Sequence, residues 1–519
     1  MAAPPAWWQT AVLYQIYPRS FCDRDGDGIG DLAGVRARLA YLRWLGVDGI
    51  WLSPIYRSPM ADAGYDVSDH CAIDPVFGDL AGFDRLLGDV HDGGQRLLLD
   101  WVPNHTSDRH PWFVESRSSR ASAKRDWYFW RDGRDGQGDA EPPNNWRAAF
   151  GGRAWTWDPT TAQWYLHLFL PEQPDLNWAN PAVAEAMHGV LRFWLDRGVD
   201  GFRADVIHLI GKDAALPDQP PDLAEIDLVG VHDHPSAHPL LRGIRAVLDD
   251  YPGERVMVGE VNLGSPRLLA PYYGTGDELH MVFNFSLLWA PWDPLEWAAR
   301  IAESEAALTP AGAWPVWVLS NHDTPRHRAR YGGSEGRARV AATVLLTLRG
   351  TPFLYAGEEL GLRDADVPAE RRVDPGGRDG CRAPIPWDGS PGHGWPATPW
   401  LPWPPDATST NAATLADDAG SILHLYRRLL AARRASAALH AGSWALLDAP
   451  PGVLAYERTA KDMGDRRRVW ANFGDGAAEC SADGRWTVQV DSSSPAADDH
   501  RVWDGHLAPA SAVVLGPAG

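Results

Sequence analysis

Short apolar runs alternate with longer amphipathic segments along most of this chain. The amphipathic segments carry apolar residues at three- and four-residue spacing, as in residues 33–46 and 182–198, which predicts helices. Strands that alternate with helices form βαβ units and a parallel sheet. The eight candidate strands lie in residues 11–18, 46–54, 96–105, 201–207, 255–262, 281–285, 315–323 and 351–359. Their number predicts an α/β fold, a (β/α)8 or TIM barrel.

Two long irregular segments interrupt this rhythm. Residues from about 105 to 178 are rich in Trp, Gly, Pro and Asn and are too long for a βα loop, so they predict a small inserted domain after the third strand. Residues from about 362 to 412 follow the eighth strand. They form either a structured wall of a pocket or a mobile lid, and composition does not choose between these.

The last part of the chain changes pattern again. Short β-like runs separated by Gly, Asp and Ser begin near residue 438 and predict an antiparallel β-sandwich. The expected domains are therefore a catalytic barrel (1–104 and 179–437), an inserted domain (105–178) and a C-terminal β-sandwich (438–519).

Composition narrows the class of partner. The formal net charge of -20 argues against nucleic acid and anionic membrane surfaces and fits a neutral or cationic small molecule. The four cysteines form no Cys-x-x-Cys pair, so neither a zinc site nor a disulfide framework is expected. Neither a signal peptide nor a transmembrane run is visible, which predicts a cytoplasmic enzyme. A monomer or homodimer is expected. The 27 tryptophans serve either as platforms for sugars or as core residues.

Candidate chemistry gathers where the predicted barrel strands end. Active sites of such barrels lie at the C-terminal ends of the strands. Those ends carry carboxylates, one arginine and two histidines, namely Asp100, His105, Arg203, Asp205, Glu260, His322 and Asp323. Singly, an aspartate there is usually a helix cap and a His-Asp pair a structural hydrogen bond. All of them together, in barrel order, favour a catalytic site.

Paired carboxylates have a specific use in cleaving glycosidic bonds. One attacks the sugar or activates water, and the other protonates the leaving oxygen. Arg203, two residues before Asp205, is expected to favour the ionised form of that carboxyl. Glu260 needs a raised pKa to act as the acid, which the surrounding like charges could supply.

Several motifs resemble one enzyme family over nearly the whole chain. The segments "DWVPNH", "GFRADV", "EV" and "NHD" match, in order and spacing, the four signature regions of glycoside hydrolase family 13, the α-amylase family. The segments "QPDLNW", "GYDVSDH" and "GRDGCRAPIPWD" resemble its α-glucosidase and oligo-1,6-glucosidase branch. This resemblance implies a retaining α-glucosidase that acts on short oligosaccharides, with no organic cofactor.

The resemblance also implies roles for individual residues. Asp205 looks like the nucleophile, Glu260 like the general acid/base and Asp323 like the carboxylate that grips sugar hydroxyls. The residues that match binders of the non-reducing glucosyl unit are Asp62, Tyr65, His105, Arg203, His322 and Arg378, with Phe150, Phe169, Gln173 and Arg382 nearby. Retention predicts a carboxyl separation of about 5–5.5 Å between nucleophile and acid.

The stretch "DRDGDGIGDLAG", residues 23–34, places acidic residues at alternate positions. An EF-hand loop would need Glu at position 12, where this chain has Gly34, so a calcium sensor is excluded. A solvated acidic loop is the plain alternative to an oxygen-ligated cation. The family resemblance implies a structural Ca²⁺, or Mg²⁺, on Asp23, Asp25, Asp27, Ile29 and Asp31.

Bond preference and reaction outcome stay open at this level. Val206, directly after the proposed nucleophile, resembles α-1,6-acting members of the branch, although the following "IHLIGKD" departs from their usual continuation. The same site also suits a transglucosylase, or an isomerase of sucrose or maltose. A non-catalytic relative, such as a transporter heavy chain, is disfavoured because Asp205, Glu260 and Asp323 are all present.

Overall fold

The computed structural model describes residues 5–134, 138–225, 232–494 and 501–518. Eight parallel strands close into a barrel in the order β1-β13-β12-β11-β10-β9-β5-β2, which confirms the predicted fold class. Each of the eight predicted segments contains one of them. Their bounds are β1 Leu13–Ile16, β2 Gly49–Leu52, β5 Arg96–Trp101, β9 Gly201–Ala204, β10 Val256–Gly259, β11 Met281–Asn284, β12 Pro315–Val318 and β13 Thr351–Tyr355.

Alternation along each strand divides the side chains between two cores. In β10, Val256 and Val258 join a cluster that fills the barrel, whereas Met257 joins the core beneath the helices. This is the period-two pattern of a strand buried on both faces. The larger helices around the barrel are α4 (Leu80–Asp92), α6 (Pro181–Asp196), α7 (Ala237–Asp249), α9 (Pro294–Leu308), α11 (Glu335–Thr347) and α13 (Ile422–Arg434).

The helix expected over residues 33–46 is divided. It forms α2 (Leu32–Ala37) and α3 (Leu39–Leu45), because the backbone of Arg38 leaves the helical region at φ -101° and ψ 4°. Helix α3 then ends at Gly46, whose φ of 103° suits a residue without Cβ. The helix expected over 182–198 is α6, which begins at Pro181.

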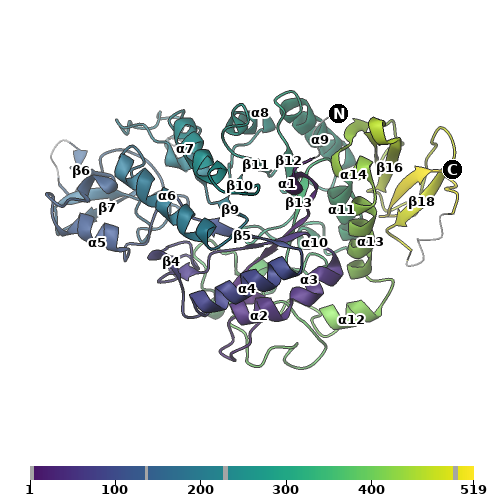
Figure 1. The fold of residues 1–519 in the computed structure, drawn as a ribbon, viewed down its shortest axis with the longest axis horizontal. Coiled ribbons are helices and arrows are strands. Elements are labelled where there is room, and N and C mark those ends of the chain that lie inside the picture. The colour runs from purple at the N-terminus through teal and green to yellow at the C-terminus, as the bar shows by residue number, and fades with distance from the viewer. Residues whose placement is uncertain (1–4, 135–137, 226–231, 495–500, 519) are drawn as a thin grey trace.

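The segment between β5 and α6 has a sheet of its own. Strands β6 (Trp130–Arg131), β8 (Gln163–Leu166) and β7 (Trp155–Asp158) pair antiparallel in that order, near helix α5 (Pro111–Ser118). In Figure 1 this insertion forms the blue end of the molecule, opposite the yellow C-terminal domain. Its buried tryptophans, including Trp146, Trp155 and Trp164, form a local core, so they serve packing rather than sugar binding.

The C-terminal region is an antiparallel β domain, as predicted. A five-stranded sheet runs in the order β14-β15-β16-β20-β18, and a two-stranded sheet pairs β17 with β19. Both sheets contribute to one hydrophobic cluster, to which Trp470 belongs on one side and Leu507 on the other. The bounds are β14 Ser443–Leu446, β15 Val453–Ala460, β16 Asp465–Asn472, β17 Ala478–Glu479, β18 Trp486–Asp491, β19 His506–Leu507 and β20 Ala512–Pro517.

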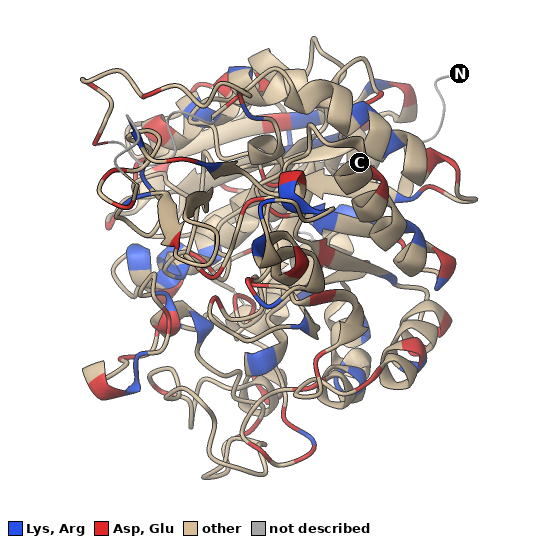
Figure 2. Ribbon diagram, turned by 90° about the vertical axis from the view of Figure 1, so that its left-hand side faces the viewer, with Lys and Arg blue, Asp and Glu red and all other residues tan. Residues whose placement is uncertain are grey.

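The structure shows how charged residues are distributed and whether the described helices could cross a membrane. Acidic and basic positions are interspersed over the face drawn in Figure 2. Among the described residues, none of the helices combines the length and apolar character needed to cross a membrane.

Candidate active site

The predicted catalytic carboxylates meet at one rim of the barrel. Asp205 directly follows β9, Glu260 directly follows β10, and Asp323 lies beyond β12. The backbone N–H of Asp205 donates to Trp101 O (2.8 Å), and that of Glu260 donates to Ala204 O (2.9 Å), so the barrel ladder continues into both residues. Parallel strands thus carry side chains that are distant in sequence to the same end of the barrel.

A single guanidinium ties this cluster together. Arg203 Nη1 donates to Asp205 Oδ1 and to Asp100 Oδ1, both at 2.8 Å, and Nη2 bonds Glu260 Oε2. The strand register pairs Asp100 with Arg203, and Asp205 follows Arg203 by two residues on the same side of the extended chain, so both carboxylates reach one guanidinium. The Arg203 side chain is 3% exposed, so the proposed nucleophile and acid share one rigid, buried partner.

Burial and Arg203 act in opposite directions on the pKa of the Asp205 carboxyl. Burial raises the pKa of this carboxyl well above the ordinary value, and the like charges of Glu260, Asp100 and Asp323 act in the same direction. Arg203 lowers the pKa, as the sequence predicted, but its effect is the smaller one.

Asp323 has the opposite environment. Burial would raise its pKa, but His322, Arg378 and Arg382 outweigh that effect and hold the pKa below the usual range. Arg378 Nη1 lies 2.8 Å and Arg382 Nη2 3.1 Å from Asp323 Oδ1. Asp323 is thus a stable carboxylate that can accept hydrogen bonds from sugar hydroxyls.

Arg378 also joins Asp323 to the opposite wall of the site. Its Nη2 donates to Asp62 Oδ1 at 2.6 Å, and Gln173 Nε2 donates to Asp62 Oδ2 at 3.1 Å. Gln173 Nε2 also lies 3.1 Å from His105 Nε2. Asp62, His105 and Arg378 line the cavity, so this hydrogen-bonded set forms part of its wall.

Two buried histidines are held as neutral imidazoles. Burial lowers the pKa of His105 to about 4 and that of His322 to about 3. His322 Nε2 lies 2.6 Å from the Tyr65 hydroxyl, and the two rings stack 5.3 Å apart. The Gln15 amide donates to His322 Nδ1 at 2.7 Å, which assigns the ring proton to Nε2.

The cavity has a volume of about 320 Å³. Predicted residues that line it are Asp62, Tyr65, His105, Phe150, Phe169, Asp205, Glu260, Asp323 and Arg378. The aromatic side rests on Phe169, whose ring lies 5.1 Å from His105, and on Phe150, beneath the Arg378 guanidinium at 5.3 Å. Four other predicted residues support the lining from behind, namely Gln173, Arg203, His322 and Arg382.

Some functional residues escaped the sequence reasoning. Asp374 accepts from Arg378 Nε (2.9 Å) and Nη2 (2.6 Å) and from Arg382 Nη1 (3.1 Å), so it aligns both guanidiniums. An acidic residue among arginines in "RRVDPGGRDGCR" was the available signal. The cavity wall also includes His208, His232 and Asn262, for which the sequence offered no pattern.

Val206 has an unusual backbone. Its φ of 35° and ψ of 42° lie in the left-handed region, where a β-branched residue is a genuine outlier. Its backbone N–H lies 3.3 Å from Glu260 Oε2. The strained residue therefore stands between the two proposed catalytic carboxylates and donates toward one of them.

A buried ammonium joins the barrel to the insertion. Lys212 Nζ donates to Asn104 Oδ1 at 2.8 Å and to Leu209 O at 2.6 Å, and lies 2.9 Å from Asp175 Oδ2. Asp175 belongs to the insertion, whereas Asn104 follows β5. The Lys212 ammonium, a cation of the protein itself, is therefore the positively charged partner of Asn104.

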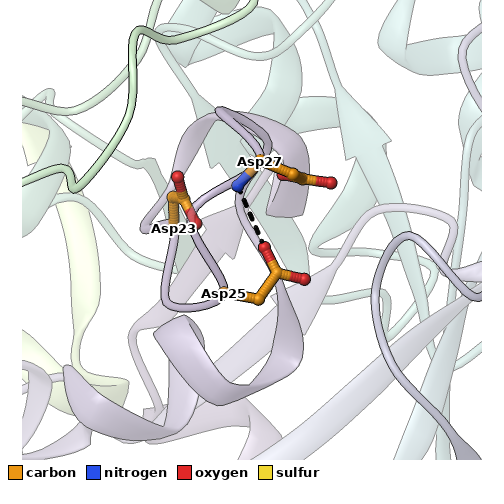
Figure 3. Close-up of side chains that lie close together, drawn as sticks. All are labelled: Asp23, Asp25 and Asp27. Carbon is orange, nitrogen blue, oxygen red and sulfur yellow. Dashed lines mark hydrogen bonds between the residues drawn. The ribbon is translucent and has the colours of Figure 1, made fainter.

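The acidic loop after β1 brings three carboxylates together. Asp23, Asp25 and Asp27 offer oxygens that all lie within 4.8 Å of one another (Figure 3). Asp31 does not join this group, because its Oδ1 accepts from Gly34 N (2.6 Å) and its Oδ2 from Arg24 N (2.8 Å). The sequence placed Asp31 among the ligands; here it caps helix α2.

Comparisons with known proteins agree with this geometry. The family described as "Alpha amylase, catalytic domain" matches residues 15–442. A probable alpha-glucosidase of Rhizobium meliloti (strain 1021) is 44% identical over 486 residues, covering 87% of each chain. An oligo-1,6-glucosidase of Parageobacillus thermoglucosidasius is 39% identical, covering 87% of this chain and 88% of that one. The crystal structure of the alpha-glucosyl transfer enzyme XgtA superposes with a TM-score of 0.91 at 40% identity, covering 99% of this chain and 100% of that one.

Proposed function

The chain belongs to the α-amylase family, and from this premise we propose that it is a retaining α-glucosidase that releases the terminal non-reducing glucose of short α-linked oligosaccharides. One observation carries the proposal: Asp205, Glu260 and Asp323 surround a cavity whose wall also includes Asp62 and Arg378. Its volume of about 320 Å³ lies at the small end of ligand sites, which suits a chain terminus.

The reaction follows from the two carboxylates on Arg203. Asp205 reacts in its ionised form, which the positive charge of Arg203 favours: a carboxylate oxygen attacks the anomeric carbon, the glycosidic C–O bond breaks, and the Glu260 proton passes to the leaving oxygen. Water then attacks the same carbon, the ester bond to Asp205 breaks, and Glu260 recovers a proton from that water. Because one guanidinium contacts both carboxylates, the closer of the two known carboxyl spacings, that of retaining enzymes, is favoured.

Asp323 and the arginines beside it are assigned to substrate binding. A carboxylate held ionised accepts hydrogen bonds from two neighbouring sugar hydroxyls as the ring flattens toward its oxocarbenium-like transition state. The neutral imidazole of His105 can donate to a further hydroxyl without adding charge.

Two observations also support glucosyl transfer at the same site. XgtA, which resembles this chain over 99% of its length, is an alpha-glucosyl transfer enzyme. His208 and His232 line the cavity with ring centroids 5.7 Å apart, and burial lowers the pKa of both. Neutral imidazoles at this position could hold a sugar acceptor in place of water.

A structural Ca²⁺, or Mg²⁺, on the loop of residues 23–31 is a further part of the proposal. Hard cations take carboxylate and carbonyl oxygens, and Asp23, Asp25 and Asp27 supply converging carboxylates. Burial raises the pKa of Asp27, and the like charges of Asp25 and Asp23 add to the shift, so a cation would relieve repulsion there. Cytoplasmic location and a monomeric or homodimeric state stay predictions for fractionation and light scattering.

The deciding experiment is product analysis on maltose, isomaltose, nigerose, kojibiose, trehalose and sucrose. Hydrolysis of a glucose disaccharide yields two glucose molecules per bond, and that ratio establishes the hydrolase and its bond; hydrolysis of isomaltose supports the α-1,6 preference predicted from Val206. A transglucosylase releases one glucose from such a disaccharide for each trisaccharide that it forms, and an isomerase yields a new disaccharide with no net glucose. Asp205→Asn is the control, and a fully active Asp205→Asn enzyme would overturn the mechanism.

A further inference from the structure

A second cavity opens beside the catalytic pocket. Its volume is about 400 Å³, and it lies between the loops that follow β10 and β11 and the side of helix α9. Helices α8 (Pro266–Leu269) and α9 lie next to each other at this edge (Figure 1). Asn262 lines both cavities, so the second cavity borders the first.

An exposed indole stands on the wall of this second cavity. Trp289 is 57% exposed, whereas most tryptophans of the described residues are buried or half-buried, and Trp44, at 37%, is the other exposed one among them. An exposed indole on a cavity wall offers an apolar ring face to a ligand. Aromatic faces pack against the C–H face of a sugar ring, and the nearby polar groups of Glu296, Arg300 and Glu303 suit sugar hydroxyls.

The second cavity lies on the side of the catalytic pocket where the leaving group is expected. The general acid protonates the oxygen that leaves, so the sugars beyond the broken bond lie on the side of Glu260. Asn262 is two residues beyond Glu260 and leads toward Trp289. The Asp62–Arg378 ion pair, at 2.6 Å, forms another part of the catalytic cavity's wall.

We propose that the groove from Asn262 to Trp289 is a binding subsite for the second sugar on the leaving-group side, stacked on the Trp289 indole. The proposal rests on the proposed function and extends it to chain length. The enzyme is matched to trisaccharides and longer α-gluco-oligosaccharides, because a disaccharide ends before it reaches Trp289.

Trp289→Ala tests the subsite with substrates of two lengths. KM and kcat are measured for isomaltose and isomaltotriose, for maltose and maltotriose, and for p-nitrophenyl α-glucoside. We expect KM for the preferred trisaccharide to rise about three- to tenfold, as the loss of one aromatic contact predicts. KM for the disaccharide and the nitrophenyl glucoside should stay the same. Trp289→Phe, which keeps a ring face, should restore most of the trisaccharide KM.

Trp44→Ala is the matched control, because it also removes an exposed indole but lies on α3 and lines neither cavity. Equal changes for all substrates in Trp289→Ala, or equal effects of the two variants, would overturn the subsite while leaving the glucosidase intact. A native enzyme with kcat/KM no higher for the trisaccharide than for the disaccharide would overturn it too, without any variant. Absence of activity on every substrate would instead refute the proposed function.

Discussion

Replacing Lys212 by methionine tests how the barrel and the insertion are joined. Methionine keeps an unbranched stem of similar length but removes the ammonium. Lys212 has a 1% exposed side chain, and its partner Asp175 is fully buried. The substitution therefore leaves the Asp175 carboxylate without its counter-charge, although Asn104 Nδ2 and Leu168 N still donate to it.

The magnitude follows from these contacts. Removing one partner of a buried ion pair costs about 3–5 kcal/mol, because the other charge stays buried and uncompensated. Leu209 O and Asn104 Oδ1 each lose a donor, so the upper part of this range is expected. With an unfolding entropy of about 2.1 cal/mol/K per residue, a chain of 519 residues loses about 1 °C of Tm per kcal/mol, so we expect Tm to fall by roughly 4–5 °C.

Differential scanning calorimetry on three variants separates the ion pair from its surroundings. Lys461→Met is the control, since Lys461 is exposed and its loss should leave Tm within about 1 °C. Lys212→Met combined with Asp175→Asn removes both charges and should recover more than about 1 kcal/mol of the single-variant loss. The reasoning fails if Lys212→Met lowers Tm no more than Lys461→Met does. It also fails if adding Asp175→Asn to Lys212→Met lowers Tm by as much as Asp175→Asn does alone.

Three other outcomes are expected. Asp374→Asn should lower kcat/KM about tenfold in steady-state assays, because Arg378 and Arg382 lose the carboxylate that aligns them; an unchanged kcat/KM would remove Asp374 from the site. Asp323 has a lower pKa in the folded than in the unfolded protein, so its ionisation contributes stability that is fully present above about pH 4. That stability is lost as the pH falls from about 4 through the folded-state pKa. The urea midpoints of the native and Asp323→Asn proteins should therefore approach each other progressively below about pH 4. Chelation should lower Tm without abolishing catalysis at once, by about 3 kcal/mol of stability if the cation is near 100 times its Kd, and Asp23→Asn should abolish that response. An identical melting curve with and without chelator would count against the cation.

The fold was largely readable from the chain because its signals are local. Each of the eight barrel strands lies within a predicted segment, and β15, β16, β18 and β20 fall where the C-terminal pattern placed strands. The short strand β14 and the sheet of β6, β7 and β8 were not predicted. The barrel strands are buried apolar runs, whereas β14 is mostly exposed and β6 has only two residues, so neither shows the apolar run that marks a strand in the sequence.

The positions of the three proposed catalytic carboxylates were likewise readable from the sequence alone. Asp205, Glu260 and Asp323 follow strands whose order defines the rim of a barrel, so their convergence follows from topology. Tertiary structure alone decided what surrounds them. The packing of Asn104 and Asp175 around Lys212, the ion pairs of Arg378 with Asp62 and Asp323, and the exposure of Trp289 all depend on distance or burial. These depend on how elements pack against one another, and no pattern along the chain encodes a contact between residues so far apart.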